Sequence, residues 1–338
     1  MTLVSSPSRA LFFSTTLVGV FLATSSSSWV MCWMGLELNL LSFIPIMSSN
    51  QNLYKSEAAL KYFLIQALGS VIILSSAPAM IFTSNNSPEI TIFLAALLKL
   101  GAAPLHFWFP AIMQGMPWPQ CIMLMTLQKL APLYLISYLY PSSNLLLLMF
   151  WASALSAFVG GIGGINQTLM RKLLAYSSIN HLGWMLASLF CSTSVMLNYF
   201  SVYSLMTISI ALVLNSSQMF HINHVVTSSF KSSSLKLYLF LNLLSLGGLP
   251  PFLGFFPKLL VISTLANQNN ILWVAILLVS ALLTLFFYVR ITISSMTLLA
   301  PKNKFDMKYP VKKLNTSLIL TFINFVPLMG PMLTSPPF

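Results

Sequence analysis

Four charged side chains interrupt long apolar stretches of this 338-residue chain. Glu37 lies in the apolar run 29–47, and Lys99, Lys129 and Lys258 are likewise surrounded by apolar sequence. A carboxylate or ammonium group in hydrocarbon is costly and usually functional. One buried acid and three buried bases therefore indicate a pathway for protons or ions.

These four groups fall near the middle of a membrane when depth is estimated from the rise of an α-helix. Each lies roughly 12–17 Å from a residue that marks a membrane face, in a core about 30 Å thick. An unpaired charge at that depth costs about 3 kcal/mol, so the groups must be paired, neutral or hydrated. Lys61 and Arg290, nearer to helix ends, can instead reach the surface along their aliphatic stems.

Burial favours the neutral form of a lysine, whereas a nearby carboxylate favours the charged form. A lysine subject to both effects can release and recapture a proton as its partner moves. We therefore predict that Glu37 and Lys99 form a switching pair, which passes protons toward Lys129 and then Lys258. A purely structural network of ion pairs is the alternative reading of the same four residues. It stays open at this point.

Two histidines are further candidates for the relay. His106 lies beside a proline-rich break and His181 lies in an apolar segment. Imidazole titrates near neutrality without help from its surroundings. A structural role is about equally compatible with both positions.

No cofactor or metal is expected on this chain. Cys32, Cys121 and Cys191 are isolated, which leaves neither a disulfide framework nor an iron–sulfur or zinc site. The run GGIGG at 160–164 follows no strand pattern, so it is not a nucleotide loop, and we expect it to allow close helix packing. Any redox chemistry must belong to other chains.

The composition is that of an all-α polytopic membrane protein. Hydrophobic residues make up 57% of the chain and charged residues only 6%, against about 25% charged residues in a soluble domain. Apolar segments long enough for a membrane helix predict eleven spans. They lie near 9–26, 29–48, 57–83, 89–114, 117–139, 143–165, 170–190, 194–220, 235–266, 270–299 and 313–332.

With eleven spans, the loop charges separate onto two sides. The opposite side from the N-terminus receives Glu89 and no lysine or arginine. By the positive-inside rule, the basic side faces the matrix or cytoplasm, which leaves the C-terminus on the other side. The basic residues on the N-terminal side are Arg9, Lys55, Arg171, Lys172, Lys231, Lys236, Lys302, Lys304, Lys308, Lys312 and Lys313.

Two spans should be broken helices. KLGAAPLHFWFP at 99–110 and LGGLPPFLGFFPK at 246–258 both place a proline three residues after a Leu-Gly glycine. Proline removes a backbone donor and clashes with the preceding turn. Because the broken spans are five helices apart, we predict two inverted five-helix repeats, 1–140 and 141–300, followed by a basic loop and C-terminal helix at 301–338. Chance similarity of two proline-containing helices is the alternative.

The two broken segments, together with GGIGGINQTLMRKLLAYSSINHLGWM at 160–185, resemble the subunit 2 family of metazoan mitochondrial NADH dehydrogenase. The resemblance covers essentially the whole chain. It implies an antiporter-like membrane subunit of respiratory complex I, with eleven helices because animal members lack three N-terminal helices of the bacterial ones. In this resemblance Glu37 matches the glutamate of the first half-repeat, Lys99 the lysine at the first break, Lys129 the bridging lysine and Lys258 the lysine after the second break.

The resemblance further implies proton translocation in the mitochondrial inner membrane, driven by reactions in other subunits. NADH, flavin, iron–sulfur clusters and ubiquinone would then belong to those subunits, and subunits 4 and 4L would be the neighbours of this chain. The N-terminus would face the matrix. Two other functions stay open, a free-standing secondary cation/proton antiporter and a membrane scaffold whose charges are merely paired.

Overall fold

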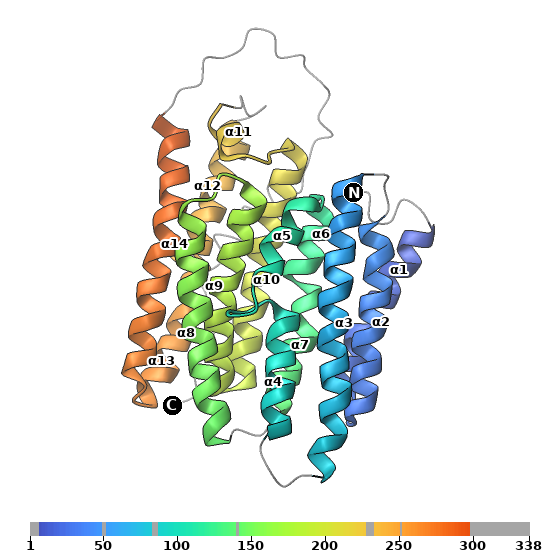
Figure 1. Cartoon of the computed structure of the whole chain (residues 1–338). Coiled ribbons are helices and arrows are strands. Elements are labelled where there is room, and N and C mark those ends of the chain that lie inside the picture. The colour runs from blue at the N-terminus through green and yellow to red at the C-terminus, as the bar shows by residue number, and fades with distance from the viewer. Residues whose placement is uncertain are drawn as a thin grey trace.

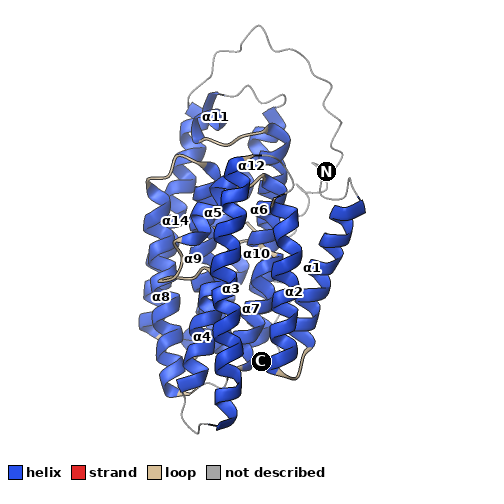
Figure 2. Cartoon of the chain, turned by 45° about the vertical axis from the view of Figure 1, so that its right-hand side comes forward, coloured by secondary structure: helices blue, strands red, loops and turns tan. Residues whose placement is uncertain are grey.

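The chain folds into a bundle of roughly parallel helices (Figure 1). A computed structural model describes residues 7–48, 52–82, 87–139, 142–227, 233–250 and 252–297. Within these ranges the structure has no β-strand, and one isolated bridge joins Leu169 to His221 (Figure 2). The all-α class predicted from composition is therefore confirmed.

Fourteen helices make up the described part of the chain. They are α1 (Pro7–Ser25), α2 (Trp29–Met47), α3 (Leu53–Phe82), α4 (Ser87–Leu100), α5 (Trp108–Gly115), α6 (Trp118–Met125), α7 (Leu127–Tyr138), α8 (Ser143–Ile165), α9 (Met170–Cys191), α10 (Thr193–Ser217), α11 (Ile222–Thr227), α12 (Ser233–Gly247), α13 (Phe255–Asn267) and α14 (Ile271–Thr297).

Seven helical stretches in the described ranges are long and apolar enough to cross a membrane. One of them, 118–138, combines α6 and α7. The pairs α4–α5 and α12–α13 are shorter helices on either side of the two predicted breaks. The predicted span 313–332 and the loop 301–313 lie outside the described residues, so the count of eleven stays a prediction.

The glycine-rich run at 160–164 brings α8 and α9 into close contact, as its sequence predicts. A Cβ atom at Gly160 would overlap the backbone nitrogen of Asn180, and one at Gly183 would lie 2.7 Å from the carbonyl oxygen of Ser153. Backbones can approach so closely only where side chains are absent or very small. α9 is consequently buried along most of its length, including His181.

Both predicted breaks are present, and each begins with the same helix cap. α4 ends before Gly101 (φ +71°), with hydrogen bonds from Ala102 N to Leu97 O (3.1 Å) and from Gly101 N to Leu98 O (3.2 Å). This is a Schellman motif, in which glycine takes up the left-handed conformation.

The second break repeats this cap at the end of α12. Gly248 has φ +80°, its N–H donates to Ser245 O (2.9 Å), and Leu249 N donates to Leu244 O (3.4 Å). Each break then runs for seven residues before the next helix, 101–107 and 248–254. The two breaks thus share the same type of helix cap, although the left-handed glycine lies three residues before the proline in the first break and two before it in the second.

Two elements were not expected from the sequence. The predicted span 117–139 is interrupted at Thr126 (φ −114°, ψ −81°), between α6 and α7. Pro132 has no N–H group to donate to the carbonyl group of Gln128, so the first turn of α7 lacks one backbone hydrogen bond. The short helix α11 follows the span predicted at 194–220.

Candidate functional site

Glu37 and Lys99 come from the middle of α2 and the end of α4, but they form no ion pair in the described structure. Glu37 is half-buried, and its Oε2 atom is buried with no hydrogen-bond partner among the described residues. Lys99 is 5% exposed and lies within electrostatic range of that carboxylate. The two groups are therefore not in contact among the described residues, and their action as a switching pair stays a prediction.

Gly69 of α3 makes room for the side chain of Lys99. A Cβ atom at this position would lie 2.9 Å from Cγ and 3.1 Å from Cε of the lysine. The carbonyl group of Lys99, freed at the helix end, accepts a hydrogen bond from Gln66 Nε2 (3.2 Å). The indole of Trp108 donates in the same way to Leu98 O (3.0 Å). Neutral donors therefore bind the carbonyl groups that α4 leaves free at the first break.

A polar cluster joins the helix of Glu37 to that of Lys129. Asn39 Nδ2 donates to Gln128 Oε1 (3.0 Å), and Gln128 Nε2 donates to Asn39 Oδ1 (2.9 Å). Tyr62 of α3 adds a hydroxyl donor to Gln128 Oε1 (3.0 Å). The cluster connects α2, α3 and α7. Asn39 follows Glu37 by two residues on α2, and Gln128 directly precedes Lys129 on α7.

Lys129 is 1% exposed at the start of α7. Its ammonium group donates to the carbonyl oxygen of Ser178 (3.3 Å) and to the hydroxyl of Tyr203 (3.4 Å). It also lies 5.2 Å from the ring centroid of Phe109 and 5.1 Å from that of Tyr203. Hydrogen bonds and aromatic faces thus replace a carboxylate as partners of this buried cation.

Lys129 and Lys258 are both within electrostatic range of the ring of His181. Its Nδ1 atom is 2.9 Å from the hydroxyl of Tyr199, and its ring centroid is 5.1 Å from that of Tyr203. A histidine with a hydroxyl partner can pass a proton between its two nitrogens. The structure therefore brings His181 together with Lys129 through two tyrosines of α10.

Lys258 of α13 caps the end of α12 across the second break. Its ammonium group donates to Gly247 O (2.8 Å) and Leu246 O (3.4 Å), and it lies 5.8 Å from the ring centroid of Trp184. A cation at the C-terminus of a helix is stabilised by the partial negative charge there. At the second break a charged group thus binds the carbonyl groups that α12 leaves free.

His106 lies apart from this row. It is 6% exposed in the segment between α4 and α5, where its Nδ1 atom is 3.2 Å from the carbonyl oxygen of Pro104. Its ring stacks at a tilt on Phe107, with centroids 4.3 Å apart. These contacts are local, and none of them reaches a lysine.

Several residues of this row were missed from the sequence. Tyr199, Tyr203, Asn39 and Gln128 sit in apolar spans, where a single polar side chain is ordinarily structural. The spacing of the two tyrosines by four residues, which puts both on one face of a helix, was the available signal. No group of three histidine, cysteine or acidic residues lies together within the described ranges.

The chain has relatives among known proteins. The chain matches the family described as NADH:quinone oxidoreductase/Mrp antiporter, TM, over residues 26–91 and 86–284. NADH-ubiquinone oxidoreductase chain 2 of Anopheles gambiae is 44% identical over 337 residues, which cover 97% of each chain.

Two solved structures are similar in fold. A chain of respiratory complex I from Thermus thermophilus is 23% identical, with a TM-score of 0.84 over 96% of this chain and 78% of that one. A chain of the Mrp complex from Dietzia sp. is 16% identical, with a TM-score of 0.79 over 95% of this chain and 75% of that one. Both breaks fall inside the matched family region.

Proposed function

The chain belongs to the family of NADH:quinone oxidoreductase and Mrp antiporter membrane subunits, and we propose that it moves protons through the buried row between Glu37 and Lys258. It acts as a membrane subunit of the complex I type NADH:ubiquinone oxidoreductase, as the name of its insect relative indicates. Protons are the species carried in this proposal, because the carboxyl, ammonium, imidazole and hydroxyl groups of the row can each bind or release a proton, while its amides, Asn39 and Gln128, join the helices.

The contact of Lys129 with Tyr203, next to the His181–Tyr199 pair, is the observation that carries this proposal. It places proton-binding groups of α7, α9 and α10 within a few ångströms of one another. Buried polar atoms normally have a partner. Glu37 Oε2 and Asn180 Oδ1, which have no partner among the described residues, therefore support internal water beside Glu37 and beside the neighbour of His181 on α9.

The finer architecture belongs to the same proposal. Eleven spans in two inverted repeats, 1–140 and 141–300, are supported by the matching caps at Gly101 and Gly248. The N-terminus lies on the matrix side of the mitochondrial inner membrane and the C-terminus on the intermembrane side. NADH, flavin, iron–sulfur clusters and ubiquinone are held by other subunits, and subunits 4 and 4L are the neighbours of this chain.

The test is the ratio of protons pumped to electrons transferred in complexes that contain a Lys129→Met chain. We expect an assembled complex that oxidises NADH but pumps with a clearly reduced ratio, because an unchargeable side chain interrupts the row. Arg290→Gln, which removes an exposed charge on α14, is the control and should keep the wild-type ratio. A wild-type ratio in the Lys129 variant would contradict the proton pathway and favour a purely structural network of ion pairs.

The free-standing antiporter is the second candidate, and the family description, which also names the Mrp antiporter, is what favours it. Native gel electrophoresis of detergent extracts separates the two functions. Co-migration with a large NADH-oxidising assembly supports the complex I subunit, whereas transport by the purified chain in liposomes supports the antiporter.

A further inference from the structure

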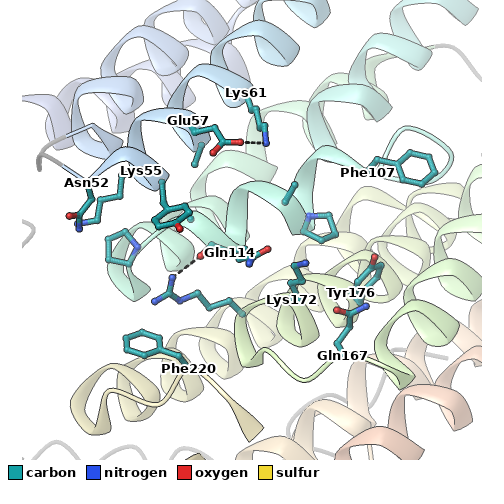
Figure 3. A pocket seen from close by; sticks show the side chains of 17 residues that line it. Asn52, Lys55, Glu57, Lys61, Phe107, Gln114, Gln167, Lys172, Tyr176 and Phe220 are labelled. Carbon is teal, nitrogen blue, oxygen red and sulfur yellow. Dashed lines mark hydrogen bonds and ion pairs between the residues drawn. The ribbon is translucent and has the colours of Figure 1, made fainter.

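A groove of about 800 Å³ opens at the ends of α3, α5 and α9, and none of the residues of the buried row lines it (Figure 3). Lys55 and Lys61 reach it from α3, and Arg171 and Lys172 reach it from α9. Three of these cations, Lys55, Arg171 and Lys172, are among the basic residues that the sequence places on one side of the membrane. The groove therefore lies where the bundle meets the basic membrane surface.

Most of these charges already have partners, and one does not. Lys61 pairs with Glu57 at 2.5 Å. Arg171 donates to Gln114 O (2.9 Å) and lies 4.4 Å from the ring centroid of Phe220. Lys172 is half-buried and has no ionic or hydrogen-bond partner among the described residues, although it points into the groove (Figure 3). The groove thus carries excess positive charge around an available ammonium group.

The wall of the groove changes from polar to apolar along α5. Gln114 lies at its polar end, and Pro110 and Ala111 lead to Phe107, which is 79% exposed. Gln114 and Phe107 are seven residues apart, which is roughly 10 Å along a helix. A water-soluble anion would need the cations alone. An amphipathic anion would also use the apolar wall.

We propose that this groove binds an anionic phospholipid, with its phosphate on Lys172 and an acyl chain along α5 toward Phe107. Basic pockets between membrane helices at the inner surface favour such headgroups, because the phosphate stays in the polar region while the chain enters the hydrocarbon. Tyr176 and Gln167 flank the lysine in the groove, where a tyrosine hydroxyl and an amide offer further hydrogen bonds to phosphate oxygens (Figure 3). The inference does not depend on proton transport.

Photolabelling of the assembled complex tests the inference. Phosphatidylglycerol with a diazirine in its acyl chain is added to the detergent-purified complex, and cross-linked peptides are located by mass spectrometry. We expect labelling of the peptide that contains 107–114, and about a fivefold loss of that label in Lys172→Gln. Lys172→Arg should restore it, and Arg290→Gln, which removes an exposed cation outside the groove, should not change it.

Other outcomes would overturn the inference. Equal labelling by phosphatidylcholine would mean ordinary boundary lipid without charge selection. Loss of the label in millimolar inorganic phosphate would mean a site for a soluble anion. A protein cross-linker placed at 172 that captures an acidic segment of another subunit, with no lipid label at 107–114, would mean a protein partner in the groove.

Discussion

Replacing Gly248 with alanine is expected to displace the ammonium group of Lys258 from the helix end that it caps. A Cβ atom at this position would lie 2.8 Å from Nζ and 2.9 Å from Cδ of the lysine. The backbone there has φ +80°, which costs an L-residue with a side chain about 1–2 kcal/mol. Loss of the charge-assisted bond to Gly247 O adds about 1.5–3 kcal/mol.

Together the two effects destabilise the second break by about 2.5–5 kcal/mol, which corresponds to roughly two to four orders of magnitude in local opening. Hydrogen exchange followed by mass spectrometry on the assembled complex measures this opening in the peptide that spans 242–250. We expect much faster exchange of the amides of residue 248 and Leu249, which are hydrogen-bonded in the native cap.

The neighbouring glycine provides the control. At Gly247 an added Cβ atom would meet its nearest neighbours at 3.7 Å, an ordinary contact, and the residue is helical. Gly247→Ala should therefore leave exchange unchanged or slow it, since alanine favours helix. Equal exchange in the two variants would refute the cap and the role assigned to Lys258 in it.

Two further predictions concern the buried row and the membrane orientation. Tyr203→Phe should lower the proton-to-electron ratio of the assembled complex while NADH oxidation persists, because Lys129 loses a hydroxyl partner at 3.4 Å but keeps the aromatic face; an unchanged ratio would remove the tyrosine from the row. A lysine-reactive reagent confined to the matrix should label Lys55 and Lys172, and labelling of these residues only from the intermembrane side would reverse the proposed orientation.

The broken helices could be predicted because their cause is local. Proline and glycine act on the backbone wherever they occur, and the breaks at 101–107 and 248–254 follow from them. The choice of Gly248 over Gly247 for the left-handed position could not be predicted, because the sequence Leu-Gly-Gly offers both. In the structure the side chain of Lys258 lies against Gly248 and donates to Gly247 O, and the sequence does not reveal these contacts.

The buried row could be predicted only in part. Charged residues in apolar sequence are conspicuous, so Lys99, Lys129 and Lys258 were found directly. Their partners depend on how distant helices pack, and Tyr203 lies 74 residues from Lys129 along the chain. The carbonyl groups that Lys258 binds carry no side-chain signal at all, so only the fold identifies them.

The two breaks differ in how they respond to a proton. Neutral donors, Trp108 and Gln66, hold the freed carbonyl groups of α4, so the first helix end keeps its contacts whatever the charge of Lys99. At α12 the contact is the ammonium group of Lys258 itself. A proton that leaves this lysine weakens its attraction to the helix end, and its return tightens the joint again. If the proposed proton pathway passes through Lys258, the end of α12 is therefore held more or less tightly according to whether that lysine carries a proton.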